Sequence, residues 1–223
     1  MSTETETPTP DLKARVLAAA ASTPAPARAR LRVRNVAIAA VAAVAVAETF
    51  AWWGGLRAAP RPTALVVETA LGAACITSVA AWAAFGQGRS MLGRSAVVLG
   101  MVSLITPATL FAWKVFWSAQ TPEMIEIWPD RPGYKCLRLS LSMAIWPLLA
   151  MVLMRRNSDP NHPRLTGASL GIAASACAWV FTDLWCPVAY VPHLLLGHVL
   201  PMILLAGAGA LLGNWLIALR PRP

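Results

Sequence analysis

The sequence predicts an all-α, polytopic membrane protein, a bundle of six transmembrane helices with a short cytoplasmic N-terminal tail. Composition is the first observation, since 57% of the 223 residues are hydrophobic and 13% are charged. Segment length is the second, because roughly 20 helical residues are needed to cross about 30 Å of hydrocarbon. Six apolar segments have that length: 36–56, 63–85, 95–117, 136–154, 165–185 and 193–219.

Basic residues are distributed unequally between the two sides of this predicted bundle. With the N-terminus in the cytoplasm, 13 Lys and Arg residues fall in inner segments and four in outer links. Such an excess marks the cytoplasmic side of a membrane protein. Both termini are therefore predicted to be cytoplasmic. The net charge of +9 follows from topology and from the anionic inner leaflet, so direct nucleic-acid binding is not expected.

The cytoplasmic tail, residues 1–35, divides into three parts. Residues 1–10 are mainly Ser, Thr, Glu and Pro and are expected to be disordered. Residues 11–22 are Ala-rich, with Leu12, Val16 and Leu17 on one side, which predicts an amphipathic helix too short to be stable alone. Residues 23–34 carry two prolines and four arginines and predict a flexible, basic tether.

The first span excludes a soluble helical protein, because Val36–Ala47 contains only Val, Ile and Ala and so has no polar face. Residues 36–219 are predicted to form the transmembrane domain and 220–223 a cytoplasmic end. Most links are short, which favours antiparallel neighbours packed side by side. We expect kinks at three prolines and close helix packing at two glycines. These residues are Pro107, Pro147, Pro201, Gly209 and Gly213.

Ionisable side chains within the spans gather in the predicted outer half of the bundle. One hypothesis is a polar cavity, open to the periplasm, that senses a ligand, an ion or a redox state. The alternative is that the cations reach the surface or pair with the acids, and that the histidines hydrogen-bond within the bundle. Glu48 and Glu68 would lie at similar depth on neighbouring spans, where they could repel, share a proton or bind a cation. The full set is Glu48, Glu68, Lys114, Arg138, Asp183, His193 and His198.

Two cysteines fall at the predicted outer ends of neighbouring spans. Cys136 and Cys186 could form a disulfide in the oxidising periplasm, or join His193 and either Asp183 or His198 in a zinc or copper site. On a regular helix, His193 and His198 diverge by about 140°. Both could bind one ion only with a kink at Pro201 or an unwound helix start. Apart from such a metal ion, no cofactor is expected, and Cys75 and Cys177 are expected to be packing residues.

Catalytic motifs are absent from the sequence. It contains no nucleophile elbow, no phosphate-binding glycine-rich loop and no His-Glu-x-x-His pair, each of which carries a known chemistry. We therefore do not expect an enzyme.

Two stretches resemble a known family. Asp183–Pro201, with the sequence DLWCPVAYVPHLLLGHVLP, and Gly133–Leu137, around Cys136, are similar to the NrsF family of six-span bacterial inner-membrane anti-sigma factors. Size, span count and the short tail are also similar to myxobacterial light-response regulators of this kind.

This resemblance implies that the cytoplasmic tail sequesters an extracytoplasmic-function sigma factor until a signal releases it. The contacts would come from the amphipathic segment, through Leu12, Arg15, Val16 and Leu17. Soluble zinc anti-sigma domains use a His-x-x-x-Cys-x-x-Cys motif, and the tail has neither His nor Cys, so that mechanism is excluded. The alternative function is a small transporter, channel or metal-handling protein that uses the outer cavity.

Overall fold

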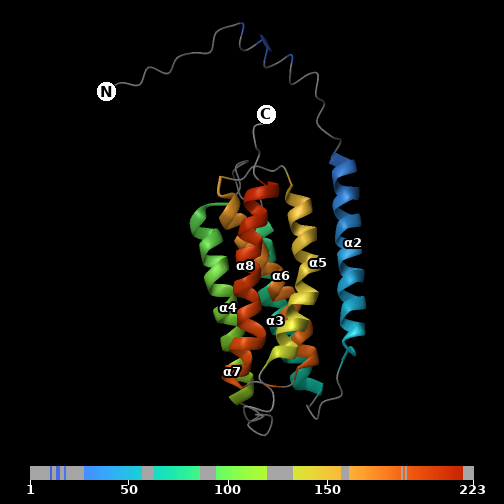
Figure 1. Ribbon diagram of the computed structural model, residues 1–223, viewed down its shortest axis with the longest axis vertical. Coiled ribbons are helices and arrows are strands. Elements are labelled where there is room, and N and C mark those ends of the chain that lie inside the picture. The colour runs from blue at the N-terminus through green and yellow to red at the C-terminus, as the bar shows by residue number, and fades with distance from the viewer. Residues whose placement is uncertain are drawn as a thin grey trace, which may run out of the picture. The chain divides into compact units, whose positions relative to one another are not determined.

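The computed structural model describes residues 11, 14, 15, 18, 28–56, 63–85, 94–119, 133–156, 161–186, 188 and 190–217. Within these residues the chain is helical and contains no strand. Six helices, of 22 to 27 residues, are long and apolar enough to cross a membrane. The helices are α2 (Arg28–Trp52), α3 (Thr63–Phe85), α4 (Ala96–Ala119), α5 (Tyr134–Arg155), α6 (Pro163–Trp185) and a last helical segment, described below (Figure 1). The predicted fold class and the six spans are confirmed.

The last helical segment is irregular. It consists of α7 (Val191–Leu194), the π-helical turn η2 (Leu195–Val199), α8 (Leu200–Leu212) and a second π-helical turn, η3 (Gly213–Ile217). Pro201 explains η2, because proline has no N–H to donate to the carbonyl of Gly197, four residues earlier. The backbone widens instead, and the N–H of Leu200 bonds to the carbonyl of Leu195, five residues back. The predicted distortion at Pro201 therefore takes the form of a π turn.

The chain divides into two compact units, Met1–Ala37 and Ile38–Pro223. In the first unit, Asp11, Ala14, Arg15 and Ala18 are helical and exposed, whereas Leu12, Val16 and Leu17 lie outside the described residues. Arg28–Arg34, which we expected to belong to a flexible tether, are helical. Ala, Leu and Arg are strong helix formers, so this stretch continues the first span in the N-terminal direction.

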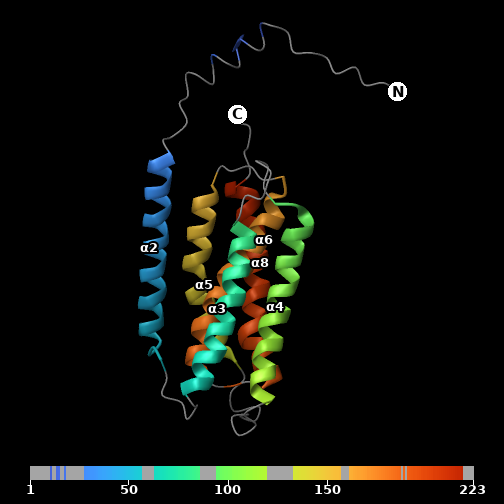
Figure 2. The same cartoon turned by 180° about the vertical axis from the view of Figure 1, so that it is seen from behind.

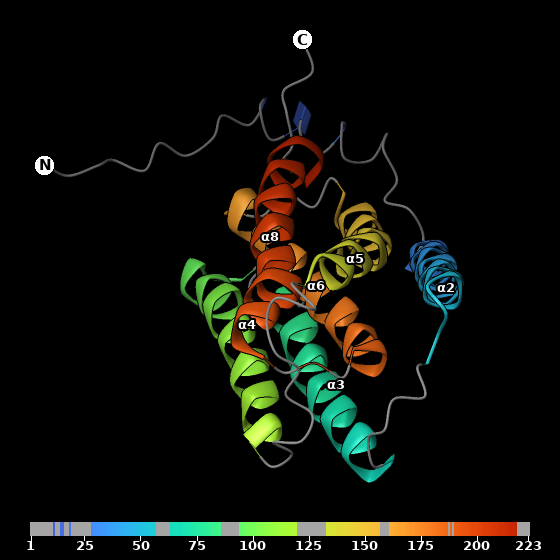
Figure 3. The same cartoon turned by 60° about the horizontal axis from the view of Figure 1, so that its bottom comes forward.

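In the second unit, α6 is the central helix. It packs against α3, α4, α5 and α8, as Figure 3 shows from the end of the bundle, and 15 of its 23 residues are buried. Seen from behind, α3 and α4 lie side by side (Figure 2). The many small residues of α6 let neighbouring backbones come close, which is the usual basis of helix packing in membranes.

Glycines bring α6 and α8 into direct backbone contact. A Cβ at Gly167 would collide with the carbonyl of Gly209, and one at Gly171 with the carbonyl of Leu205. Gly213 likewise lies against the backbone of Pro163 and Gly167. The predicted packing role of Gly209 and Gly213 is thus borne out by these contacts, and α6 supplies the matching glycines.

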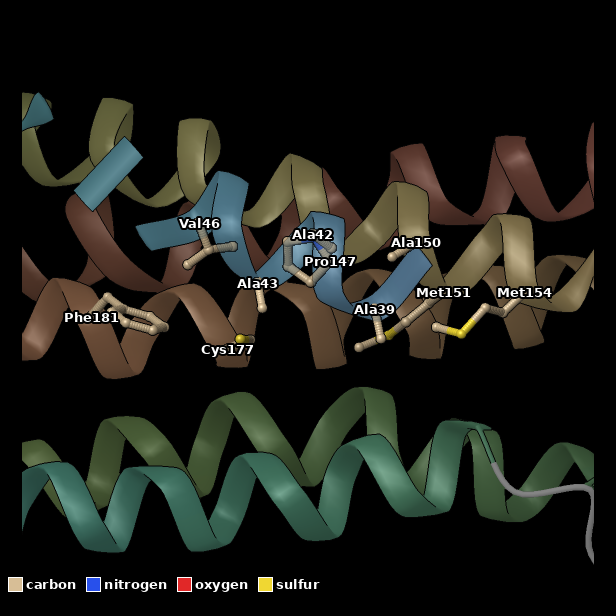
Figure 4. A pocket seen from close by; sticks show the side chains of 10 residues that line it. All are labelled: Ala39, Ala42, Ala43, Val46, Pro147, Ala150, Met151, Met154, Cys177 and Phe181. Atoms are coloured by element: carbon tan, nitrogen blue, oxygen red, sulfur yellow. The ribbon is translucent and has the colours of Figure 1, made fainter. Parts of the chain in front are cut away.

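The part of α2 from Ile38 onward contacts α5 and α6. Trp146 of α5 donates a hydrogen bond to Thr49 Oγ1 at 2.9 Å, and the rings of Phe50 and Phe181 are 5.5 Å apart. An apolar cavity of about 280 Å³ lies between these three helices, bounded by α2 alanines on one side and by Pro147 and Phe181 on the other (Figure 4). This first span therefore packs beside the fourth and fifth spans.

Candidate functional site

Four side chains with metal-binding atoms meet at one end of the bundle, where α2, α4 and α6 finish and α5 and α7 begin. Cys136 is in the first turn of α5, and Cys186 directly follows α6. His193 belongs to α7 and His198 to η2. One sulfur or nitrogen atom from each lies within 4.8 Å of the others, and all four residues are buried. We call this set the Cys-His cluster.

Two glycines allow Cys136 to reach the histidines. Gly133 precedes α5 with a φ of 94°, a conformation that favours glycine, and a Cβ there would lie 2.9 Å from the carbonyl oxygen of His193. A Cβ at Gly197 would lie 2.9 Å from Cys136 Cβ. The start of α5 and the η2 turn therefore touch through their backbones, which places the Cys136 thiol beside the histidine pair.

The π turn places His193 and His198 on the same side of the last helical segment. Their ring centroids are 5.7 Å apart, although the residues would diverge on a regular α-helix. A backbone with i→i+5 hydrogen bonds brings residues five apart into line. The π turn therefore brings the two histidines together, for which we expected a kink at Pro201 or an unwound helix start.

Neither cysteine takes part in a disulfide in the structure, so the expected alternative of a disulfide is not the state described. Cys186 Sγ lies 3.2 Å from His193 Nε2, within hydrogen-bond distance. A hydrogen bond with Cys136 lowers the pKa of the Cys186 thiol well below its usual range, although burial alone would raise it. The neighbouring imidazoles act in the same direction as Cys136.

His198 is the least satisfied member of the cluster. It is 1% exposed, and neither Nδ1 nor Nε2 has a hydrogen-bond partner. One face of its surroundings is aromatic, because the Trp179 ring lies 4.9 Å away, centroid to centroid, in an edge-on arrangement. A buried polar group without a partner carries a desolvation cost of about 1–3 kcal/mol. The burial of the His198 ring nitrogens therefore lowers stability unless another group binds them.

Asp183, one of the two groups considered as a fourth ligand, is paired elsewhere. Its carboxylate forms a buried ion pair with Lys114 of α4, and His198 takes the fourth position in the cluster. Next to Asp183, Thr182 Oγ1 lies 3.0 Å from Ser140 Oγ, which ties α6 to α5. This pair follows the alternative in which acids within the spans pair with cations.

The other expected sensing residues lie apart from the cluster. Glu48 and Glu68 are exposed, and Figure 3 shows α6 between α2 and α3, so the expected placement of these carboxylates on neighbouring helices is wrong. Short connections suggested that α2 would pack on α3, but α2 contacts α5 and α6 instead. Arg138 is exposed, Cys177 is partly buried, and Cys75 is exposed rather than packed inside.

Sequence reasoning missed the residues that assemble the cluster. Gly133 and Gly197 were within the stretches singled out by resemblance, but their close backbone contact had no signal in a single sequence. Ser140 and Thr182 look like ordinary polar residues of a span. Their hydrogen bond and that from Ser140 Oγ to the Gly197 carbonyl, at 3.4 Å, depend on which helices meet.

These features define a class of protein: a six-helix membrane protein with a buried set of thiols and imidazoles at one end. Residues 17–218 match the family model NrsF, described as negative regulator of sigma F. The chain belongs to this family, as its resemblance implied.

A curated protein of Azospira oryzae, described as "Probable anti-sigma-F factor NrsF", is 35% identical to the chain over 82 residues. This similarity spans 36% of the chain and 38% of the relative. No solved structure matches the chain.

Proposed function

We propose that the protein is a membrane-bound anti-sigma factor of the bacterial inner membrane. In this role it holds a sigma factor of the extracytoplasmic-function class through its cytoplasmic tail and releases it on a signal. The observation that carries the proposal is the family match over residues 17–218. The relative's name refers to an anti-sigma-F factor, which supports a sigma factor as the partner and a regulatory rather than an enzymatic role.

The tail is the segment best suited to bind this partner. With both termini in the cytoplasm, residues 11–34 are the longest cytoplasmic stretch of the chain. Leu12, Arg15, Val16 and Leu17 would dock as a helix in a groove of the sigma factor, where the apolar side chains provide most of the affinity. Ala14, Arg15 and Ala18, which the structure describes, are helical and exposed, as a helix available for docking requires.

A matched pair of double variants tests the tail. Leu12→Asp with Val16→Asp places two charges on the apolar face. Ala14→Asp with Ala18→Asp adds the same charges at the same spacing on the opposite face. We expect the first pair to weaken binding of the purified sigma factor by about 100-fold or more, a loss of several kcal/mol. The sigma-dependent promoter should then be active without a signal.

The control pair should change affinity by no more than a few-fold. Full repression by the Leu12→Asp, Val16→Asp protein, at equal abundance in the membrane, would overturn the assignment of the partner to this tail.

Topology has its own test. An alkaline-phosphatase fusion after Arg220 should be inactive and a fluorescent-protein fusion there bright, because both termini are proposed to be cytoplasmic. An active phosphatase fusion would imply an odd number of spans and would sink the six-span arrangement.

We further propose that the signal acts at the Cys-His cluster. The cluster joins α5, α6 and the last helical segment, so a change there can shift their packing, as two-state helix rearrangements require. The test compares induction in Cys136→Ser and Cys186→Ser proteins with a Cys75→Ser, Cys177→Ser control. Normal repression and induction in the Cys136→Ser, Cys186→Ser double variant would leave these thiols as structural groups and return the sensing role to Glu48 and Glu68.

A further inference from the structure

The Cys-His cluster has the composition of a complete metal site. Two thiols and two imidazoles, the ligand set Cys₂His₂, suffice for a closed tetrahedral centre without water or substrate. All four side chains are at most 2% exposed, and no other group of three or more Cys, His, Asp or Glu side chains with this proximity occurs in the part of the chain that the structure describes. We propose that Cys136, Cys186, His193 and His198 bind one Zn²⁺ ion in a four-coordinate site that links α5, α6 and the last helical segment.

The distances fit a site that needs only small adjustments. Around zinc, with bonds of about 2.0–2.3 Å, tetrahedral ligand atoms lie about 3.3–3.8 Å from one another. The four atoms are already within 4.8 Å of one another, and Cys186 Sγ and His193 Nε2 are 3.2 Å apart. The widest separations must shrink by about 1 Å, which changes in side-chain torsion angles can supply.

His198 provides an independent observation. A histidine that only packs in a core normally donates or accepts at least one hydrogen bond, yet neither ring nitrogen of this buried residue meets a partner with hydrogen-bond geometry, although the residue lies beside the Cys186 thiol. The π turn that aligns it with His193 is also a feature often found at functional sites. A metal ion would bind one of these nitrogens directly. The π turn would then serve to bring both histidines to the same ion.

Charge favours zinc over copper at this position. Binding requires both cysteines as thiolates and both imidazoles neutral, so any proton still on a thiol passes to solvent, and the Zn²⁺ site then carries no net charge. Cu⁺ in the same set would leave one negative charge, which is costly in a buried, low-dielectric environment. Lys114, the cation of α4, does not offset this charge because Asp183 already pairs with it.

The experiment measures metal directly on the full-length protein, purified in detergent and reconstituted with Zn²⁺, Co²⁺ or Cu⁺. We expect one Zn²⁺ per chain, and Co²⁺ absorption bands typical of thiolate ligands in tetrahedral geometry. Loss of a ligand should weaken Zn²⁺ binding by more than the roughly 10- to 100-fold cost of losing an outer-shell partner. The variants are Cys136→Ser, Cys186→Ser, His193→Gln and His198→Phe.

His198→Phe keeps an aromatic ring against Trp179 and so separates metal binding from packing. The Cys75→Ser, Cys177→Ser protein is the matched control and should bind one Zn²⁺ as tightly as the wild type. Failure of the wild type to retain Zn²⁺, unchanged Zn²⁺ affinity in His198→Phe, or tighter binding of Cu⁺ than of Zn²⁺ in competition would each overturn the proposal. Sigma-factor binding, measured on the same samples, reports on the proposed function separately, because the metal site does not depend on it.

Discussion

Helices α6 and α2 both have the length and hydropathy of membrane spans, but they are packed in opposite ways. In α6, 15 of 23 residues are buried, whereas between residues 38 and 52 of α2, all described, only Val46 is buried. The backbone of α6 touches α8 through glycines, whereas an apolar cavity lies along part of the contact of α2 with α5 and α6 (Figure 4).

This difference divides the bundle into a closely packed part around α6 and a loosely packed helix, α2. The Cys-His cluster is held by α5, α6 and the last helical segment, which are closely packed. The chain continues from α2 into the tail, and α2 makes few buried contacts that would resist a shift. Helix α2 can therefore shift with little loss of packing energy, because low-stability elements are the ones that move.

The largest expected effect on stability comes from the buried ion pair between α4 and α6. Lys114→Met leaves the Asp183 carboxylate buried without its cation and should lower the free energy of unfolding by about 3–5 kcal/mol. Adding Asp183→Leu removes the remaining charge and should recover most of that loss. Reversible unfolding in mixed detergent micelles measures both values.

Arg138→Met is the matched control for this pair, because Arg138 is exposed and its loss should change stability by less than about 0.5 kcal/mol. Equal stability of the Lys114→Met protein and the wild type would mean that the pair does not hold α4 to α6.

A smaller effect is expected where α6 meets α8. Gly167→Ala adds a Cβ that collides with the Gly209 carbonyl and should cost about 1–3 kcal/mol through forced backbone shifts. Gly207→Ala is the control, since a Cβ there meets nothing within 4 Å, and alanine should stabilise the helix by up to about 1 kcal/mol. If the two variants were equally stable, the contrast between a tight and a loose region would have no energetic basis.

The contact between α2 and α5 should contribute less. Trp146→Phe removes the hydrogen bond to Thr49 Oγ1 and should cost about 0.6 kcal/mol, the average for side-chain hydrogen bonds between membrane helices. Thr49→Val should cost about the same, and the double variant no more than either single one, because both remove one bond. A coupling of several kcal/mol in this cycle would instead make α2 a firmly fixed helix.

The smallest energetic effect is expected from filling the cavity beside α2. Ala43→Leu adds apolar volume at its wall and should change stability by less than about 1 kcal/mol, since small gains in packing and small shifts of α2 oppose each other. Labelling of Cys177, which lines the cavity, by an apolar maleimide should become slower. An Ala40→Leu protein is the control, because Ala40 is exposed and does not line the cavity, and unchanged labelling in the Ala43→Leu protein would show that the added side chain does not occupy this space.

Much of the fold could be predicted because long apolar segments leave few alternatives in a membrane. The bounds of α3 agree with the predicted span, and those of the other helices differ mainly at their ends. Which helices are neighbours in the bundle was harder to predict from the sequence. Connection length suggested α2 beside α3, but which helices meet depends on shape and on small residues, and α6 carries those residues for most of the bundle.

Only part of the Cys-His cluster could be predicted from the sequence. Cys136, Cys186 and His193 stood out because all three fall at helix ends on the same predicted side. The alignment of His198 depends on a π turn, and a regular helical period places that residue elsewhere. Asp183 seemed equally suitable as a ligand until Lys114, far away in sequence, was found beside it.

The loose packing of α2 also has a consequence for the order of synthesis. This helix leaves the ribosome before every other span, yet its contacts are with α5 and α6, which are made about a hundred residues later. Until then it must persist in the lipid alone, which a helix can do because its backbone hydrogen bonds are satisfied internally. The uninterrupted apolar run Val36–Ala47 suits that interval. The residues that precede this helix are therefore synthesised before the end of the bundle that carries the Cys-His cluster.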